Sequence, residues 1–413
     1  MNHRRQGFVF ILAFILAGPP AKAQDPPAGL TLDQAVETAL KAHPDILAAQ
    51  AGIKAASARR LQAEARPDPR LSWGTAGIPW TLRSGSLETE YSLGLEQTLE
   101  YPGRRAARVE IGRVGEGIAA LELDRTQLVL AASVRKAYFR VVRSDRAQAL
   151  LASASGLLDS VIEAVQVRYA AGRAAYADVL RARVDKARLQ NQAIEERRER
   201  HAAAAELNAL LGRPAGEPLR LVSGLESPPL VRTAEEIKAA APAEHPSLRI
   251  AELRAEQASA AERLVGLNRK PDLTAGLFVP SKSVSGWGFS LGLTLPLSAK
   301  RWSGERAEAA AAREAGSVLV DGFRRRIAAM IEAAFESARL ADEQVRVFEL
   351  QLLADLEDEL KTELDLYALG KTEAYALLDL YRTAAEARLE HLRAVYNGAI
   401  ARIDLEIAGE ESF

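Results

Sequence analysis

Residues 286–296 read GWGFSLGLTLP, and every large apolar side chain of this stretch falls on an odd-numbered position. Trp287, Phe289, Leu291 and Leu293 alternate with glycine, serine and threonine. Because successive side chains of a β-strand point to opposite faces, the pattern predicts a strand with one large apolar face and one small or polar face. A length of about 10 residues suits a tilted strand that crosses a membrane, and it equally suits a half-buried sheet of a soluble protein.

Three further stretches carry the same alternation, at residues 71–79, 89–99 and 272–280. In the second of them, Tyr91 and Leu93 hold the large apolar phase. We therefore predict four strands, and we predict that lipid contacts the apolar face through a set of residues from two of them: Tyr91, Leu93, Trp287, Phe289, Leu291 and Leu293.

Landmarks in the chain recur in the same order, which indicates an internal duplication. HP at 43–44 recurs at 245–246, PD at 67–68 recurs at 271–272, and YAAG at 169–172 recurs as YALG at 367–370. The offset is about 200 residues in every case, as expected for two copies of one structural unit. We expect a first repeat at residues 24–220 and a second at residues 221–413.

Each repeat ends in a long stretch without proline that is rich in alanine, leucine, glutamate and arginine, which favour helices. The only convincing turns within these stretches are at Gly172 and Gly370, so we predict antiparallel helical hairpins at residues 103–211 and 301–407. A helix over 103–171 would span about 100 Å, far more than the core of an ordinary globular domain.

The composition excludes several classes of function. The 54 basic and 55 acidic residues leave no surplus of positive charge for a dedicated nucleic-acid-binding protein. The chain has no cysteine, which removes disulfides, thiolate metal sites and a lipid anchor on an N-terminal cysteine. The sequence GFSLG at 288–292 matches a hydrolase nucleophile motif, but the strand alternation continues through it, so we expect neither an enzyme nor a bound cofactor.

The first 23 residues have the features of a secretory signal peptide. Arg4 and Arg5 precede an apolar run at 8–17, and residues 21–23 read AKA, a small-x-small cleavage site. After this segment no uninterrupted apolar run approaches the roughly 18 residues of a transmembrane helix, so we expect none. An exported chain whose strands adjoin helices of about 100 Å has no second layer to cover the sheet, which favours insertion of the strands into a membrane.

Four strands cannot close a membrane barrel, because the smallest have about eight. Two copies would give about eight strands, whose interior side chains fill, so three copies are the first assembly expected to leave a pore. We therefore expect a mainly helical fold in which each of three chains contributes four strands to a small β-barrel.

With these features the whole mature chain resembles the outer-membrane efflux protein family, the TolC family. The resemblance rests on the duplication, the four strands, the tip motifs RYAAG at 168–172 and LYALG at 366–370, and YADVL at 176–180. It implies a homotrimeric channel-tunnel in the outer membrane whose helical tube lies in the periplasm. It also implies two protein partners, a periplasmic adaptor and an inner-membrane pump.

The resemblance further implies two sets of functional residues. The hairpin tips would dock on the adaptor through Gly172, Arg173, Gly370 and Lys371. A periplasmic gate would contain Asp178 and Tyr367 as a hydrogen-bonded pair, and Asp379 as an acidic ring. Ala177, Thr372 and Ala376 replace polar or charged residues of the family, which implies a looser gate.

The stretch EYPGRR at 100–105 resembles the branch of the family that serves heavy-metal pumps of the resistance-nodulation-division type. The composition itself offers few soft metal ligands, since only Met330 follows the initiating methionine. The alternative that the residues leave open is a periplasmic coiled-coil scaffold or adaptor without membrane strands.

Overall fold

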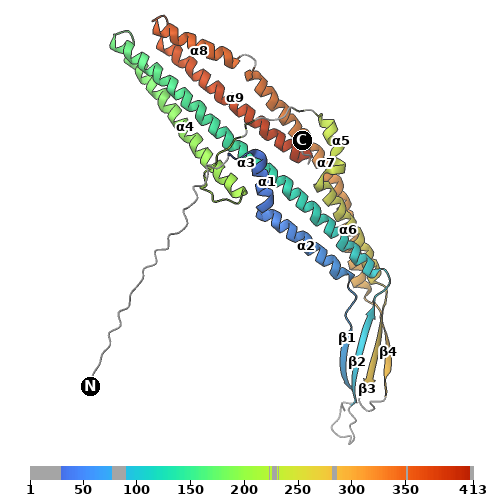
Figure 1. Cartoon of the computed structure of the whole chain (residues 1–413). Helices are drawn as coiled ribbons and strands as arrows, with labels where there is room; N and C mark the ends of the chain where they lie inside the picture. Colours follow the sequence, from blue (N-terminus) through green and yellow to red (C-terminus); the bar gives the residue numbers. More distant parts are fainter. Residues whose placement is uncertain are drawn as a thin grey trace, which may run out of the picture.

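The computed structural model describes residues 29–76, 90–222, 224–225, 230, 232–280, 286–349 and 352–409. The expected signal peptide at 1–23 lies outside these residues. The described chain is elongated, with a small sheet at one end and two helical tips at the other (Figure 1). The predicted fold class, mainly helical with four antiparallel strands, is confirmed.

The elements follow the order expected for a duplicated unit. The first half contains α1 (Leu32–Ala42), α2 (Pro44–Glu64), β1 (Arg70–Ala76), β2 (Glu90–Leu99), α3 (Arg104–Ala170) and α4 (Tyr176–Leu210). The second half contains α5 (Ala234–Glu244), α6 (Pro246–Asn268), β3 (Asp272–Pro280), β4 (Gly288–Thr294), α7 (Ala299–Glu349), α8 (Leu352–Ala368) and α9 (Ala374–Gly409). Residues 77–79, which we expected to extend the first strand, lie outside the described residues.

The repeated histidines stand at equivalent helix starts. His43 accepts a hydrogen bond on Nδ1 from the main-chain N–H of Asp45 at 3.2 Å, which caps α2. His245 occupies the same position before α6 and is buried. Burial and the positive charge of Arg125 lower the pKa of His245 to about 4.

The four strands form one antiparallel sheet in the order β1-β2-β3-β4. Leu71 pairs with Leu95 across β1 and β2, and Leu277 pairs with Phe289 across β3 and β4. Each pair of strands lies next to the helices that enter and leave it, so all four helix–strand junctions meet at the same end of the sheet (Figure 1).

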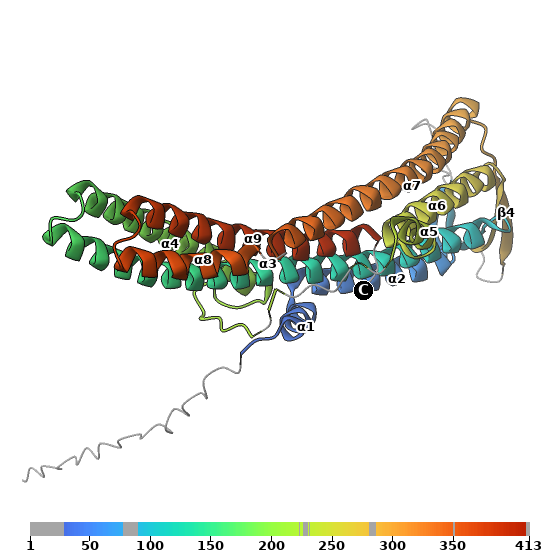
Figure 2. The same ribbon diagram turned by 90° about the horizontal axis from the view of Figure 1, so that it is seen from above.

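Helix α3 is the continuous axis of the chain. It has 67 residues, packs against α2 and α6 near the sheet, and packs against α4 and α9 toward the tips (Figures 1 and 2). Its buried residues occur along most of its length, from Arg104 to Val165. In the second half, the expected long helix is two elements, α7 and α8, so the two hairpins differ.

By length and hydropathy alone, α3 is the one described helix that could cross a membrane. The sequence analysis counted uninterrupted apolar runs, whereas this criterion averages over 18 residues and tolerates polar residues and up to two charged ones. We assign α3 to the helical part of the molecule because its apolar residues pack against α4, α6 and α9.

Candidate functional site

One face of the sheet is covered with large apolar side chains that no other part of the described chain covers. Trp73 pairs with Leu93 and Ala275 pairs with Leu291 on this face. Phe289 and Leu291 are 70% and 69% exposed. Burying such side chains releases about 25 cal/mol per Å2, so this face requires another apolar medium or partner.

The opposite face carries mostly glycine, serine and threonine at the paired positions, together with the larger Glu96 and Phe278. The strands are close on this side: a Cβ added to Gly276 would lie 2.5 Å from Oγ of Ser290. The residues 288–292 that match a nucleophile motif form the body of β4, and no turn into a helix occurs there.

The six residues predicted to face lipid take the following places. Leu93, Phe289, Leu291 and Leu293 are exposed on the large apolar face, and Trp287 is exposed directly before β4. Tyr91 lies in β2 opposite Thr75, and its side chain is outside the description.

The two hairpin tips have the same backbone structure. Gly172 and Gly370 have φ angles of 72° and 77°, in the left-handed region that favours glycine. In the first tip, the N–H of Arg173 donates to the carbonyl of Arg168 at 2.8 Å, and in the second the N–H of Lys371 donates to Leu366 at 2.9 Å. These bonds close each helix with a Schellman motif.

The tips are open surfaces. Gly172, Arg173, Gly370 and Lys371 are all exposed. A Cβ added to Gly172 would meet no atom within 4 Å. The rings of Tyr169 and Tyr176 lie 5.7 Å apart beside the first tip, and both residues are exposed. The tip residues thus present positive charge and aromatic surface at the end farthest from the sheet (Figure 1).

Arg168 links the two tips, a role that the sequence did not reveal. Its Nη1 donates to the carbonyls of Tyr367 and Thr372 at 3.3 and 3.2 Å. Its guanidinium carbon lies 4.6 Å from the centre of the Tyr367 ring. The position of Arg168 in the last turn of α3 could have indicated this role, because an arginine there can reach carbonyl groups of a neighbouring turn.

The expected hydrogen bond between Asp178 and Tyr367 is not formed within the described chain. The carboxylate of Asp178 instead accepts from the N–H of Ala175 at 3.3 Å and lies 3.7 Å from Arg181. It caps α4, because a carboxylate in the first turn satisfies a free N–H of the helix start. The Tyr367 hydroxyl is buried without a hydrogen-bond partner among the described residues.

Electrostatics at Tyr367 reflect its position between the tips. Burial raises the pKa of its hydroxyl, the charge of Arg168 opposes this rise, and the charge of Asp178 adds to it. The charge of Asp178 therefore influences Tyr367, although the two side chains form no hydrogen bond in the described chain.

Asp379 lines an open groove between α4 and α9. Its carboxylate forms an ion pair with Arg382 at 2.6 Å and is half exposed. The groove, with a volume of about 430 Å3, also contains Arg181, Asp185 and Arg188. Three arginines and two aspartates thus line it, so Asp379 stands in a mixed rather than a purely acidic environment.

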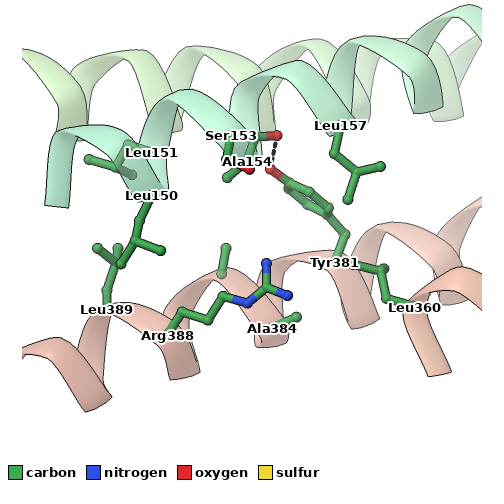
Figure 3. Close-up of a pocket in the computed structure, with 11 residues that line it drawn as sticks. Leu150, Leu151, Ser153, Ala154, Leu157, Leu360, Tyr381, Ala384, Arg388 and Leu389 are labelled. Carbon is green, nitrogen blue, oxygen red and sulfur yellow. Dashed lines mark hydrogen bonds between the residues drawn. The ribbon is translucent and has the colours of Figure 1, made fainter. Parts of the chain in front are cut away.

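Toward the middle of the molecule, α3 and α9 are held together by a buried tyrosine. Figure 3 shows Tyr381 reaching from α9 to the backbone of α3, where its hydroxyl donates to the carbonyl of Ala154. Burial raises the pKa of Tyr381. The adjoining cavity has a volume of only about 30 Å3, and leucines from both helices line it. This contact is helix packing, with no room for a substrate.

The part of the chain that the structure describes contains no group of three or more His, Asp or Glu side chains that could hold a metal ion.

Comparison with known proteins agrees with this architecture. Residues 35–213 match the family described as outer membrane efflux protein. No curated protein is detectably similar in sequence. Among solved structures, CusC shares 18% identity with a TM-score of 0.79, and the match covers 94% of this chain and 96% of CusC.

Two further channels have the same fold. The outer membrane protein VceC of Vibrio cholerae shares 17% identity with a TM-score of 0.79, over 92% of this chain and 96% of VceC. The MtrE outer membrane channel of Neisseria gonorrhoeae shares 20% identity with a TM-score of 0.78, over 92% of this chain and 89% of MtrE. These likenesses concern the fold, and they extend over both halves of the chain. The first half of the chain thus matches the model of the outer membrane efflux protein family over residues 35–213, and the whole described chain shares the fold of three channels.

Proposed function

We propose that three copies of this chain form a channel-tunnel that passively conducts substrates out of the cell. The observation that carries the proposal is the sheet, whose large apolar face is exposed and whose edge strands β1 and β4 are both unpaired in the described chain. Lipid would cover the face, and neighbouring copies would pair with the edges. The small polar face would line the pore.

Three copies fit the geometry better than two. Two copies would contribute about eight strands, and a barrel of that size is filled by its own side chains. Three copies would contribute about twelve and leave a lumen. The helical hairpins would then continue the barrel as a tube into the periplasm, since α3 with its 67 residues extends about 100 Å from the sheet.

The tips would dock on a periplasmic adaptor, through which an inner-membrane pump delivers substrates. The exposed Gly172, Arg173, Gly370 and Lys371 support this role because they lie at the end of the molecule farthest from the sheet. The left-handed glycines also allow another chain to approach closely.

The gate would lie directly behind the tips, where Asp178, Tyr367 and Asp379 are found. In a trimer the unpartnered Tyr367 hydroxyl is a candidate for a hydrogen bond that helps to close the tube. Three copies of Asp379 around the axis would attract cations, with Arg382 reducing the effect.

A metal-cation efflux system, with a pump of the resistance-nodulation-division type, is the finer form of this proposal. Its support is the stretch at 100–105 and a fold shared with CusC, which VceC and MtrE share equally. The test is to measure the tolerance of cells that express the complete system to metals and to drugs. Higher tolerance to a metal would support metal efflux, and higher tolerance to a drug would support drug efflux. The repeat boundaries at 24–220 and 221–413 also remain proposals.

The test of the main proposal is fractionation followed by electrical recording. The full chain, expressed with its leader, should appear in the outer-membrane fraction as a trimer that resists dissociation until heated. The purified trimer should form conducting pores in planar lipid bilayers. Monomers in the soluble periplasm, with no conductance, would instead support the alternative of a coiled-coil scaffold or adaptor.

A further inference from the structure

A buried arginine fastens the two repeats to each other where the sheet meets the helices. Nη1 of Arg104, in the first turn of α3, donates to both carboxylate oxygens of Asp272 at 2.6 and 2.5 Å. Nη2 donates to the carbonyls of Leu267 and Lys270, at the end of α6, at 3.1 and 2.9 Å. The N–H of Tyr101 donates to the same carboxylate at 3.2 Å. We call the Arg104–Asp272 contact the junction clamp.

The duplication produces a second aspartate at an equivalent helix–strand junction, Asp68, and this one has no basic partner in the described chain. We call the two junctions the Asp272 corner and the Asp68 corner. Asp68 follows a proline between α2 and β1, as Asp272 follows a proline between α6 and β3. In the sheet, β3 has β2 beside it, whereas β1 is an edge strand. Asp68 is exposed, and its side chain makes no ion pair or hydrogen bond within the described ranges.

The start of α7 is the counterpart of the start of α3. Nη2 of Arg108, near the start of α3, donates to the carbonyl of Ala65, directly after α2, at 3.4 Å. The ring of Trp302, near the start of α7, lies 4.3 Å from the guanidinium carbon of Arg269, directly after α6. Each helix thus contacts the residue directly after the preceding helix of its own repeat, α3 through a hydrogen bond and α7 through a cation–π contact. By the same correspondence, the free side of α7 should face an Asp68 corner, as α3 faces the Asp272 corner.

The residue placed to reach that corner is Arg301. An α-helix turns about 100° per residue, so Arg301 lies about 100° around α7 from Trp302, to one side of the face that contacts Arg269. Arg301 is 73% exposed, and its one ion pair is with Glu305 on its own helix at 3.3 Å. Such an exposed pair contributes little and is readily exchanged. Leu319, about five turns further along the same face, is an exposed apolar residue, and so is Leu61 on α2.

We propose that Arg301 of one copy forms an ion pair with Asp68 of the neighbouring copy, as the intersubunit counterpart of the junction clamp. The occupant of this surface is a second copy of the chain, because only a copy that pairs its β1 with β4 brings an Asp68 corner to α7. The opposite charges of Arg301 and Asp68, which adjoin the two unpaired edge strands β4 and β1, support this occupant. The inference rests on the proposed trimer and specifies one of its contacts.

Cross-linking tests the proximity directly, because the natural chain has no cysteine. The double variant Asp68→Cys with Arg301→Cys, in outer membranes, is treated with a short bis-maleimide and analysed on denaturing gels. We expect covalent dimers and trimers. The matched control, Asp45→Cys with Arg301→Cys, places the first cysteine at the far end of α2 and should remain monomeric on the same gel.

Charge reversal tests whether the contact stabilises the assembly. Asp68→Arg and Arg301→Asp should each lower the temperature at which the trimer dissociates, and the double reversal should recover most of this loss. Arg325→Asp, at an exposed position further along the same helix, is the control for a change of charge. Recovery in the double variant is the result that a merely structural effect of either substitution would not give.

The outcomes separate this inference from the proposed function. A wild-type chain that forms no trimer contradicts both. A stable wild-type trimer without the Asp68–Arg301 cross-link, or with no recovery in the double reversal, overturns the intersubunit clamp and leaves the channel proposal intact.

Discussion

Leu291 offers the sharpest test of the membrane assignment. It is the middle residue of β4, faces the large apolar side of the sheet and is 69% exposed in the single chain. Its neighbour Ser290 lies on the opposite face of the sheet, beside Gly276 of β3. Leu291→Arg and Ser290→Arg therefore introduce the same side chain one residue apart, on two opposite faces.

The expected difference follows from the cost of a charge in lipid. An arginine at the lipid-facing midplane of a barrel costs about 2 to 4 kcal/mol, whereas a lumen-facing one costs little. Three copies would add about 6 to 12 kcal/mol per trimer, comparable with the whole stability of many folded proteins, about 5 to 15 kcal/mol. Leu291→Arg should thus deplete the trimer in the outer membrane, and Ser290→Arg should not.

The assay is the amount of heat-dissociable trimer in isolated outer membranes, normalised to the total amount of chain. Expression of the chain in whole cells controls for synthesis. Equal depletion by both variants would mean that the faces of the sheet are not divided between lipid and lumen. A normal level of trimer for Leu291→Arg would refute the lipid-facing assignment itself.

Three further predictions concern the tips, the gate and the start of α6. Replacing both Gly172 and Gly370 with valine forces β-branched residues into a left-handed backbone, at a cost of about 1 to 2 kcal/mol each. Efflux, measured as drug or metal tolerance, should then fail while the trimer remains in the membrane. Loss of the trimer would contradict a docking role. Asp379→Asn should lower the cation preference of reversal potentials in planar bilayers, and Tyr367→Phe should raise the frequency of opening; unchanged selectivity and gating would remove these residues from the constriction. The pKa of His245 in the folded chain is about 4, below its usual 6.5, so the unfolded chain binds a proton at higher pH than the folded chain does. The free energy of unfolding should therefore fall as the pH decreases from about 6.5 to 4. His245→Gln should abolish this part of the pH dependence in thermal unfolding, and an unchanged profile would contradict the prediction.

Much of the fold could be predicted from local patterns. The alternation at 286–296 predicted a strand with one apolar face because a strand has a side-chain period of two, and β4 has that face. The glycines at 172 and 370 predicted turns because few other residues adopt a left-handed backbone, and both have positive φ angles.

The sequence predicted that the tip and gate candidates lie at one end of the chain, whereas their contacts depend on the tertiary structure. The tip and gate residues lie near one another because the hairpins bring residues about 200 positions apart to the same end. The predicted Asp178–Tyr367 bond is absent from the described single chain, where Asp178 accepts from the N–H of Ala175 at the start of α4, and it stays a prediction for the assembled tube. Arg168, which the sequence analysis assigned no role, makes the bonds between the tips instead.

The sequence by itself determined the periodicities: which segments are strands, which are long helices, and where each hairpin turns. These are properties of neighbouring residues, and they follow from backbone geometry. Only the tertiary structure decided that β2 pairs with β3, that Arg104 clamps Asp272, and that Asp379 lies among arginines of α4 and α9. The physical reason is that such contacts join residues far apart in the chain, whose partners are chosen by packing and charge in three dimensions and leave no mark on a local pattern.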